Sequence, residues 1–245
     1  MRLLLLAALM LAAGAATAQH QPKPDLARPG SSFSADGKPG KWATTIARTP
    51  QGHLIGNPEA EARLAMFLSY TCPDCADFVT RGEPALDLVL IAPGTMSLEL
   101  RPQVRGGLDL AVSLLAQCGD AAGFRARHRA LMRAQPRWLA KARAAPASQQ
   151  AIWERGDRPA RLNAASALGL TDLLARRGQS RSALDACLSD DAAAKRLRAG
   201  TAADRAALAI GTVPAFALDG KLLTGVNGWD TLYPVLSARF APPPE

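Results

Sequence analysis

Two cysteines stand three positions apart in the stretch SYTCPDCADF, with Pro73 and Asp74 between Cys72 and Cys75. Such a pair can exchange disulfides, bind a soft metal ion or form a structural crosslink. Because proline suits the first turn of a helix, we expect a helix to begin at this pair. Free backbone N–H groups and the helix dipole would then stabilise the thiolate of Cys72. We expect an exposed sulfur at Cys72 and a deeper one at Cys75, an arrangement that suits disulfide exchange.

The segments around the pair predict the strands that hold it. The run LAMFLS, residues 64–69, ends at the pair and is typical of a strand buried on both faces. Residues 96–100 alternate as a strand, and the β-branched residues of 42–46 predict another. Residues 215–218 and 221–224 flank an Asp-Gly turn, which predicts a hairpin.

Between residues 107 and 209 the leucines take helical spacing, and we count four or five helices there. A further helix is predicted over residues 229–236. Strands joined by helices and followed by a hairpin describe a small α/β sheet with a helical insertion. The predicted breaks within the insertion lie near Gly119, near Pro136, across 145–159 and near Gly178.

The N-terminus has the pattern of a secretory signal. A short positive start precedes the apolar run 3–11, and small residues end at Ala16-Thr17-Ala18. The apolar run is too short to span a bilayer. We therefore predict a signal peptide over residues 1–18, a flexible Pro- and Gly-rich leader over 19–40, and a soluble periplasmic protein. Disulfides persist in such an oxidising compartment.

The net charge of +8 comes mainly from arginines that are scattered along the chain. Scattered rather than clustered arginines argue against a nucleic-acid partner. The sequence has no phosphate loop, no paired-carboxylate motif and no serine elbow. His53 and His128 are lone histidines, which we interpret as surface or packing residues. No metal or organic cofactor is expected.

Two stretches together resemble a known family. GHLIGNPEAEARLAMFLSYTCPDCADF is similar to the opening of the DsbA-like branch of the thioredoxin superfamily, and GTVPAFALDGKLL is similar to its cis-proline loop and hairpin. The resemblance implies a thioredoxin fold with a large all-helical insertion. It places the first part of the thioredoxin domain at 41–106, the insertion at 107–209 and the second part at 210–245.

The resemblance also implies a site and an activity. Cys72 would be the nucleophile and Cys75 the resolving cysteine, with Pro214 in the cis form facing them. Thr212 and Val213 would complete the loop that holds an extended client peptide. The implied protein is a periplasmic thiol:disulfide oxidoreductase, most simply a monomeric dithiol oxidase. It would act on cysteine-containing exported proteins and be re-oxidised by a membrane redox partner.

Two positions depart from the family pattern. Many relatives carry His where this chain has Asp74, and a carboxylate there raises the pKa of the Cys72 thiol instead of lowering it. This predicts a weaker oxidant. Many relatives also carry a buried acid six residues before the pair, where this chain has Met66. Asp77, Glu99 or a water molecule are the candidates to replace that acid, and the sequence does not choose between them.

The other two cysteines, Cys118 and Cys187, both fall within the predicted insertion. If Cys72 and Cys75 form one pair, the pairing that is left is Cys118–Cys187. We favour a structural disulfide. Two separate buried thiols and a second redox-active pair stay open as alternatives.

Three other functions compete with a dithiol oxidase. A reductase or isomerase would use the same chemistry in the opposite direction, and Asp74 gives this version weight. A CxxC pair also binds Cu(I), although no compact cluster of further His or Met ligands accompanies it here. The third is a client-binding module in which Cys72–Cys75 is only structural.

Overall fold

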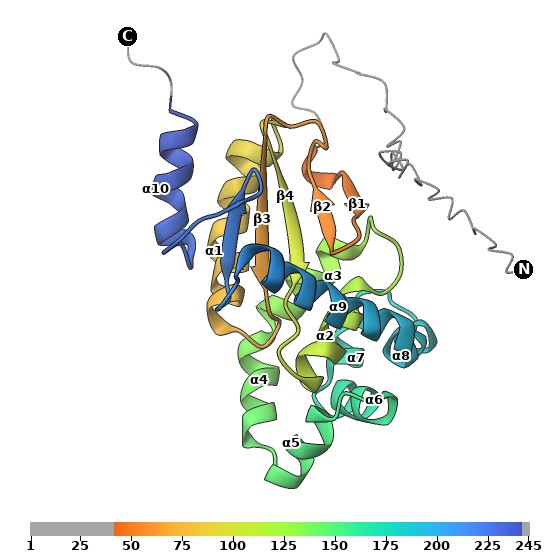
Figure 1. The fold of residues 1–245 in the computed structure, drawn as a ribbon. Helices are drawn as coiled ribbons and strands as arrows, with labels where there is room; N and C mark the ends of the chain where they lie inside the picture. Colours follow the sequence, from red (N-terminus) through yellow and green to blue (C-terminus); the bar gives the residue numbers. More distant parts are fainter. Residues whose placement is uncertain (1–41, 242–245) are drawn as a thin grey trace, which may run out of the picture. The chain divides into compact units, whose positions relative to one another are not determined.

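A six-stranded mixed sheet lies at the centre of the fold (Figure 1). The computed structural model describes residues 42–241, so the predicted signal peptide and leader lie outside the described residues. Strands β3 and β4 are parallel, and every other neighbouring pair is antiparallel. In sheet order the strands are β1 (Ile46–Arg48), β2 (His53–Ile55), β4 (Met96–Pro102), β3 (Ala62–Leu68), β5 (Ala215–Leu218) and β6 (Lys221–Leu222).

Strand β3 is buried on both faces because its alternate residues belong to two hydrophobic clusters, with Leu64 and Met66 in one and Phe67 in the other. Leu64 lies opposite Leu98 of β4 on one side and Leu218 of β5 on the other. Met66 and Phe67 are fully buried within the same strand. This is the environment that a continuous apolar run predicts. The strand ends four residues before Cys72, so the cysteine pair lies just beyond the carboxyl end of this inner strand.

The helix after β3 begins at the cysteine pair, as predicted. Helix α1 spans Pro73–Leu86, with Pro73 in its first turn and Cys72 as its N-cap. It continues into a short π-helical segment, Asp87–Ile91. Helix α10, Trp229–Arg239, packs beside α1 through an edge contact between the Trp229 and Phe78 rings. These helices fix the direction in which the cysteine pair leaves the sheet.

The predicted first strand over residues 42–46 is wrong in its first part. Trp42–Thr44 form a short 3-10 helix, and pairing with β2 begins at Ile46. The cause is a tertiary contact that the local sequence does not show. The Trp42 ring packs over Gly94, where an added Cβ would lie 2.7 Å from it.

The predicted number of four or five helices in the insertion is also wrong. Eight helices lie between Gly107 and Leu208. Leucine spacing does not show where one helix ends and the next begins, and capping residues such as Asp157, Ser180 and Asp190 mark three of the helix N-termini. The helices are α2 (Gly107–Gln117), α3 (Phe124–Arg133), α4 (Gln135–Ala144), α5 (Ala147–Glu154), α6 (Arg158–Ala167), α7 (Leu170–Ala175), α8 (Arg181–Ser189) and α9 (Asp191–Leu208).

Helix α9 ties this helical block to the sheet. The buried carboxylate of Asp204 accepts hydrogen bonds from Arg101, at the end of β4, and from Gln103 at 2.9 Å. The Thr201 hydroxyl accepts a hydrogen bond from the Val104 N–H at 2.9 Å. Figure 1 shows α9 returning the chain from the helical block to β5. The order of strands and helices is that of the predicted thioredoxin fold with extensive helical content, and the fold class is confirmed.

Within residues 42–241, no helix is long and apolar enough to cross a membrane.

Candidate active site

Cys72 and Cys75 lie at the N-terminus of α1, and neither is in a disulfide. The Cys72 backbone is extended, so the chain turns into the helix directly at this residue. The Cys75 N–H donates to the Cys72 sulfur at 3.2 Å. Cys72 therefore caps the helix with its sulfur, as an Asp or Ser caps other helices with oxygen.

The cis-proline loop lies against the first sulfur. The peptide bond between Val213 and Pro214 is cis, and the Val213 carbonyl oxygen is 3.5 Å from the Cys72 sulfur. Pro214 is buried and Thr212 is exposed. The prediction that Cys72 is exposed is wrong, because the residue is only 3% exposed. The loop that the sequence places far downstream covers it.

A glutamine from the helical block holds the backbone of the pair. The side-chain amide of Gln135, at the start of α4, donates to the carbonyl oxygens of Tyr70 and Cys72, both at 2.8 Å. Gln135 is 1% exposed. The helical block thus helps to hold residues 69–72, the cysteine loop, in place.

The pKa values of the two thiols are shifted in opposite directions. The hydrogen bond from the Cys75 thiol lowers the pKa of Cys72, against burial; the Cys75 N–H and the charge of Arg105 lower it further, and Asp74 raises it. Burial raises the pKa of Cys75 well above its ordinary value, together with the hydrogen bond and the charge of Cys72. In the reduced pair, Cys72 is therefore the cysteine that forms the thiolate, and Cys75 is the one that keeps its proton.

Arg105 is the cation that faces this pair, and sequence reasoning missed it. Its guanidinium donates to the hydroxyls of Ser69 at 3.0 Å and of Thr71 at 3.1 Å. Both residues lie on the loop that ends at Cys72. The charge of Arg105 lowers the pKa of both cysteines and opposes that of Asp74.

A buried carboxylate, Asp109 in the first turn of α2, organises the same loop. It accepts hydrogen bonds from the Ser69 hydroxyl at 2.7 Å, the Tyr70 N–H at 2.9 Å and the Arg105 N–H at 3.0 Å. Burial raises the pKa of Asp109, while these hydrogen bonds lower it. In the sequence, the only sign of this buried carboxylate is an Asp within the apolar helix stretch GLDLAVSLL.

The acids that we weighed as replacements at Met66 lie elsewhere. Asp77 is exposed and forms a bidentate contact with Arg81 in the next turn of α1. Glu99 lies on β4, opposite Ala65 of β3. Neither has a described hydrogen bond to the cysteine loop, whereas Asp109 has two.

A second buried polar network fixes α1 against α3. His128 lies between Glu83, at 3.0 Å from its Nε2, and the Tyr70 hydroxyl, at 2.9 Å from its Nδ1. Arg129 also donates to Glu83 at 2.9 Å. Burial raises the pKa of Glu83, but the charge and hydrogen bond of His128 and the charges of Arg129 and Arg125 bring it below its ordinary value. His128 is thus a packing residue with two hydrogen-bond partners.

Cys118 and Cys187 form a disulfide in this structure. It joins the residue after α2 to α8, with 5.7 Å between the two Cα atoms. The crosslink lies wholly within the helical block. Among residues 42–241, no group of three or more His, Cys, Asp or Glu side chains is arranged to hold a metal ion.

A cavity of about 320 Å³ opens beside the cysteine loop. Thr71 and Arg105 line it on the side of the sheet, and Leu139, Arg143 and Trp153 line it on the side of the helical block. Its lining combines apolar side chains with two guanidinium groups and the carboxylates of Asp109 and Glu154.

Comparison with known proteins supports the same class. A family model described as thioredoxin matches residues 48–238. The crystal structure of a protein-disulfide isomerase from Novosphingobium aromaticivorans has 36% sequence identity and a TM-score of 0.75, and the match covers 78% of this chain and 99% of that chain. The match with Wolbachia pipientis alpha-DsbA1 has 17% identity and a TM-score of 0.60, over 78% of this chain and 92% of that chain. The match with BdbD from Bacillus subtilis has 16% identity and a TM-score of 0.55, over 81% and 97%. The comparison with curated proteins gave no match.

The chain therefore belongs to the thioredoxin family that this model describes, and its fold is that of the DsbA-like structures. The prediction of a disulfide oxidoreductase is confirmed at this level.

Proposed function

We propose that the protein is a periplasmic oxidoreductase that donates the Cys72–Cys75 disulfide to cysteine-containing exported proteins. The observation that carries this proposal is the opposite shift in the pKa values of the two thiols beneath the Val213 carbonyl. Stabilising the Cys72 thiolate favours the reduced form of the pair. The Cys72–Cys75 disulfide is therefore readily transferred to a client protein. The signal-like sequence of residues 1–18 supports export.

The reaction proceeds by two thiol–disulfide exchanges. A client thiolate attacks the Cys72 sulfur, and the Cys72–Cys75 bond breaks with its electron pair on Cys75. The Ser69 N–H and Arg105 stabilise that sulfur until it takes up a proton. A second client thiolate then attacks the client sulfur of the mixed disulfide and expels Cys72 as a thiolate. Two electrons pass from the client to the pair, and a membrane redox partner removes them.

The client segment would lie along the cis-proline loop. Thr212 is exposed and Val213 is half-buried, so their backbone can pair with an extended peptide beside the sulfur. The cavity between Arg105 and Trp153 is lined by Thr71, the residue before Cys72, and would offer space for client side chains.

Arg105 bears on the direction of the reaction. Asp74 alone would raise the pKa of Cys72 and weaken the oxidant, but Arg105 acts in the opposite sense. Since Arg105 also acts on Cys75, it stabilises the reduced pair as a whole. The departure at Asp74 is therefore compensated within the site.

The second candidate function is disulfide isomerisation. It is favoured by the 36% identity with the protein-disulfide isomerase from Novosphingobium aromaticivorans, which is matched over 99% of its chain. An isomerase works from the reduced pair, and the Cys72 thiolate alone begins and ends each rearrangement.

The deciding experiment measures the reduction potential of Cys72–Cys75 and two activities. For an oxidase we expect a potential above about −180 mV and rapid oxidation of reduced, unfolded ribonuclease. A Cys75→Ser variant would lose that activity, since it cannot carry a disulfide. A potential near −230 mV or lower, with repair of scrambled ribonuclease that survives in Cys75→Ser, would reject the oxidase and establish the isomerase.

A further inference from the structure

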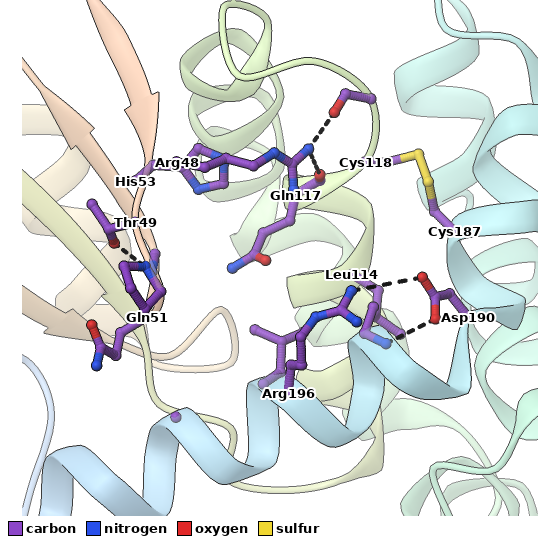
Figure 2. A pocket seen from close by; sticks show the side chains of 16 residues that line it. Arg48, Thr49, Gln51, His53, Leu114, Gln117, Cys118, Cys187, Asp190 and Arg196 are labelled. Atoms are coloured by element: carbon purple, nitrogen blue, oxygen red, sulfur yellow. Dashed lines mark hydrogen bonds and ion pairs between the residues drawn. A yellow bond between two sulfur atoms is a disulfide. The ribbon is translucent and has the colours of Figure 1, made fainter. Parts of the chain in front are cut away.

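A second cavity, of about 450 Å³, lies between the β1–β2 hairpin, the end of α2 and the start of α9 (Figure 2). Its volume falls within the range of about 300–1,000 Å³ that is usual for small-molecule sites. It shares no lining residue with the cavity beside Cys72. The Cys118–Cys187 disulfide forms part of its wall, so a ligand here would meet sulfur.

Arg48 brings positive charge to one end of that disulfide. Its guanidinium donates to the main-chain carbonyl of Gln117, at 3.1 Å, and to that of Gly119. These two residues flank Cys118 on either side. The position of the guanidinium is therefore fixed close to the Cys118 backbone, where it favours negative charge.

Arg196, on α9, adds a second cation to the same cavity. Its described partner is Asp190, at 3.9 Å, and its side chain is 69% exposed. Such a long, exposed ion pair is weak, and the guanidinium is free to turn toward a ligand. Arg48 and Arg196 against the single carboxylate of Asp190 give the lining a positive balance, which suits a carboxylate-bearing ligand.

His53 forms an aromatic part of the cavity wall. The residue is 1% exposed and lines the cavity, and neither ring nitrogen has a hydrogen-bond partner among the described residues. Its ring stacks on Phe124 with 3.7 Å between centroids, and Figure 2 shows it on the cavity wall with Arg48. Both nitrogens are themselves buried, so a ligand in the cavity would meet the carbon atoms of this ring and not these nitrogens.

The two cysteine residues of the disulfide are unequally exposed. Cys187 is half-buried, whereas Cys118 is 3% exposed. The Cys118 sulfur lies 3.4 Å from the Ala183 carbonyl oxygen, which is an acceptor for a thiol at this position. An incoming thiolate would therefore reach Cys187 and expel Cys118.

We propose that this cavity is a second thiol-exchange site, which takes a small thiol bearing carboxylates and directs its sulfur to Cys187. The arginines bind the carboxylates, and the His53 ring forms part of the wall against which the ligand lies. The ligand thiolate forms a bond to the Cys187 sulfur. The Cys118–Cys187 bond breaks with its electron pair on Cys118. The Cys118 thiolate then takes a proton from water, and the resulting thiol donates a hydrogen bond to the Ala183 carbonyl oxygen. One disulfide replaces another, and there is no net oxidation.

The test uses the full chain with Cys72→Ser and Cys75→Ser. Since the chain has 4 cysteines, only the Cys118–Cys187 pair can then react. This variant is incubated with reduced glutathione or with uncharged 2-mercaptoethanol, quenched by alkylation and mapped by peptide mass spectrometry. We expect glutathione on Cys187, an alkylated Cys118, and a rate constant per thiolate about tenfold above that of 2-mercaptoethanol.

Two arginine variants, made in the same background, separate a site from general attraction to a basic protein. Arg196→Gln should lower the glutathione rate constant about threefold to fivefold, as the loss of one ion pair predicts. Arg205→Gln, an exposed position on the same helix, changes the net charge equally and should leave it unchanged. Equal rate constants for the two thiols, attachment to Cys118, or equal effects of the two variants would overturn the proposal.

A binding measurement on the wild-type chain completes the test. S-methylglutathione cannot react, and we expect saturable binding by calorimetry that Arg48→Gln weakens. No binding by the wild type would also reject the site. None of these outcomes depends on Cys72 or Cys75, so the proposed disulfide donation stands or falls separately.

Discussion

Replacing Arg105 by Gln should make the protein a weaker oxidant. The guanidinium is bound to the Ser69 and Thr71 hydroxyls and lowers the pKa of both cysteines. For a charge roughly 7 Å away at an effective dielectric constant of about 40, Coulomb's law gives about 1 kcal/mol. That corresponds to a rise of about one unit in the pKa of Cys72 and a fall of about 20 mV in the reduction potential.

The matching change at Asp74 should have the opposite sign. Asp74→Asn removes the charge that raises the pKa of Cys72, so its pKa should fall and the potential should rise by a similar amount. In the double variant Arg105→Gln/Asp74→Asn the two effects should largely cancel. Arg133→Gln, an exposed position on α3, serves as the net-charge control.

The assay is equilibration with a glutathione redox buffer, read by thiol trapping, together with the ultraviolet absorbance of the thiolate as a function of pH. Because Arg105 is exposed, the shifts should shrink at high ionic strength. If Arg105→Gln has a potential equal to or above that of the wild type, Arg105 does not stabilise the reduced pair and our reasoning is wrong.

Three further predictions concern stability. Glu83→Gln should cost about 3 kcal/mol or more in urea unfolding because it breaks the buried pair with His128, while Asp77→Asn in its exposed pair with Arg81 should cost less than about 1 kcal/mol; equal costs would contradict the role of the buried network. Burial, then Arg48, Arg127 and His128, lower the pKa of His53 to about 3, so below the unfolded value of 6.5 the unfolded chain binds the extra proton and stability falls as the pH falls. The loss from pH 7 to pH 5 should be about 2 kcal/mol from this residue, and His53→Phe should abolish it; an unchanged pH slope in that variant would show that His53 is not responsible. Removing the disulfide with Cys118→Ala/Cys187→Ala should lower the free energy of unfolding by about 4 kcal/mol in the chain-entropy view of its 69-residue separation, and an unchanged urea midpoint would contradict this.

The sequence predicted those parts of the site whose signals are local. A buried strand, a CxxC pair and a proline in the first turn specify β3, the loop and the start of α1 within a few residues of each other. The DsbA-like resemblance brought the distant Val213–Pro214 segment to the pair, and in the structure it lies there.

Residues whose partners lie far away in sequence were not found. Arg105 and Asp109 contact a loop that ends more than thirty positions earlier, and Gln135 reaches the same loop from further still. Polar residues of this kind look like any helix or loop residue until the fold brings their partners to them. The short helices of the insertion were missed for a related reason, because leucine spacing does not show where one helix ends and the next begins.

The amide of Gln135 has a mechanical consequence. Its two hydrogen bonds attach α4 to the carbonyls of Tyr70 and Cys72, so a displacement of α4 has to break both bonds or shift the Cys72 backbone. A client that pries α4 away from the sheet would withdraw both bonds at once and release the peptide that carries the nucleophile. The position of α4 and the orientation of the Cys72 sulfur are thereby coupled through the Gln135 side chain.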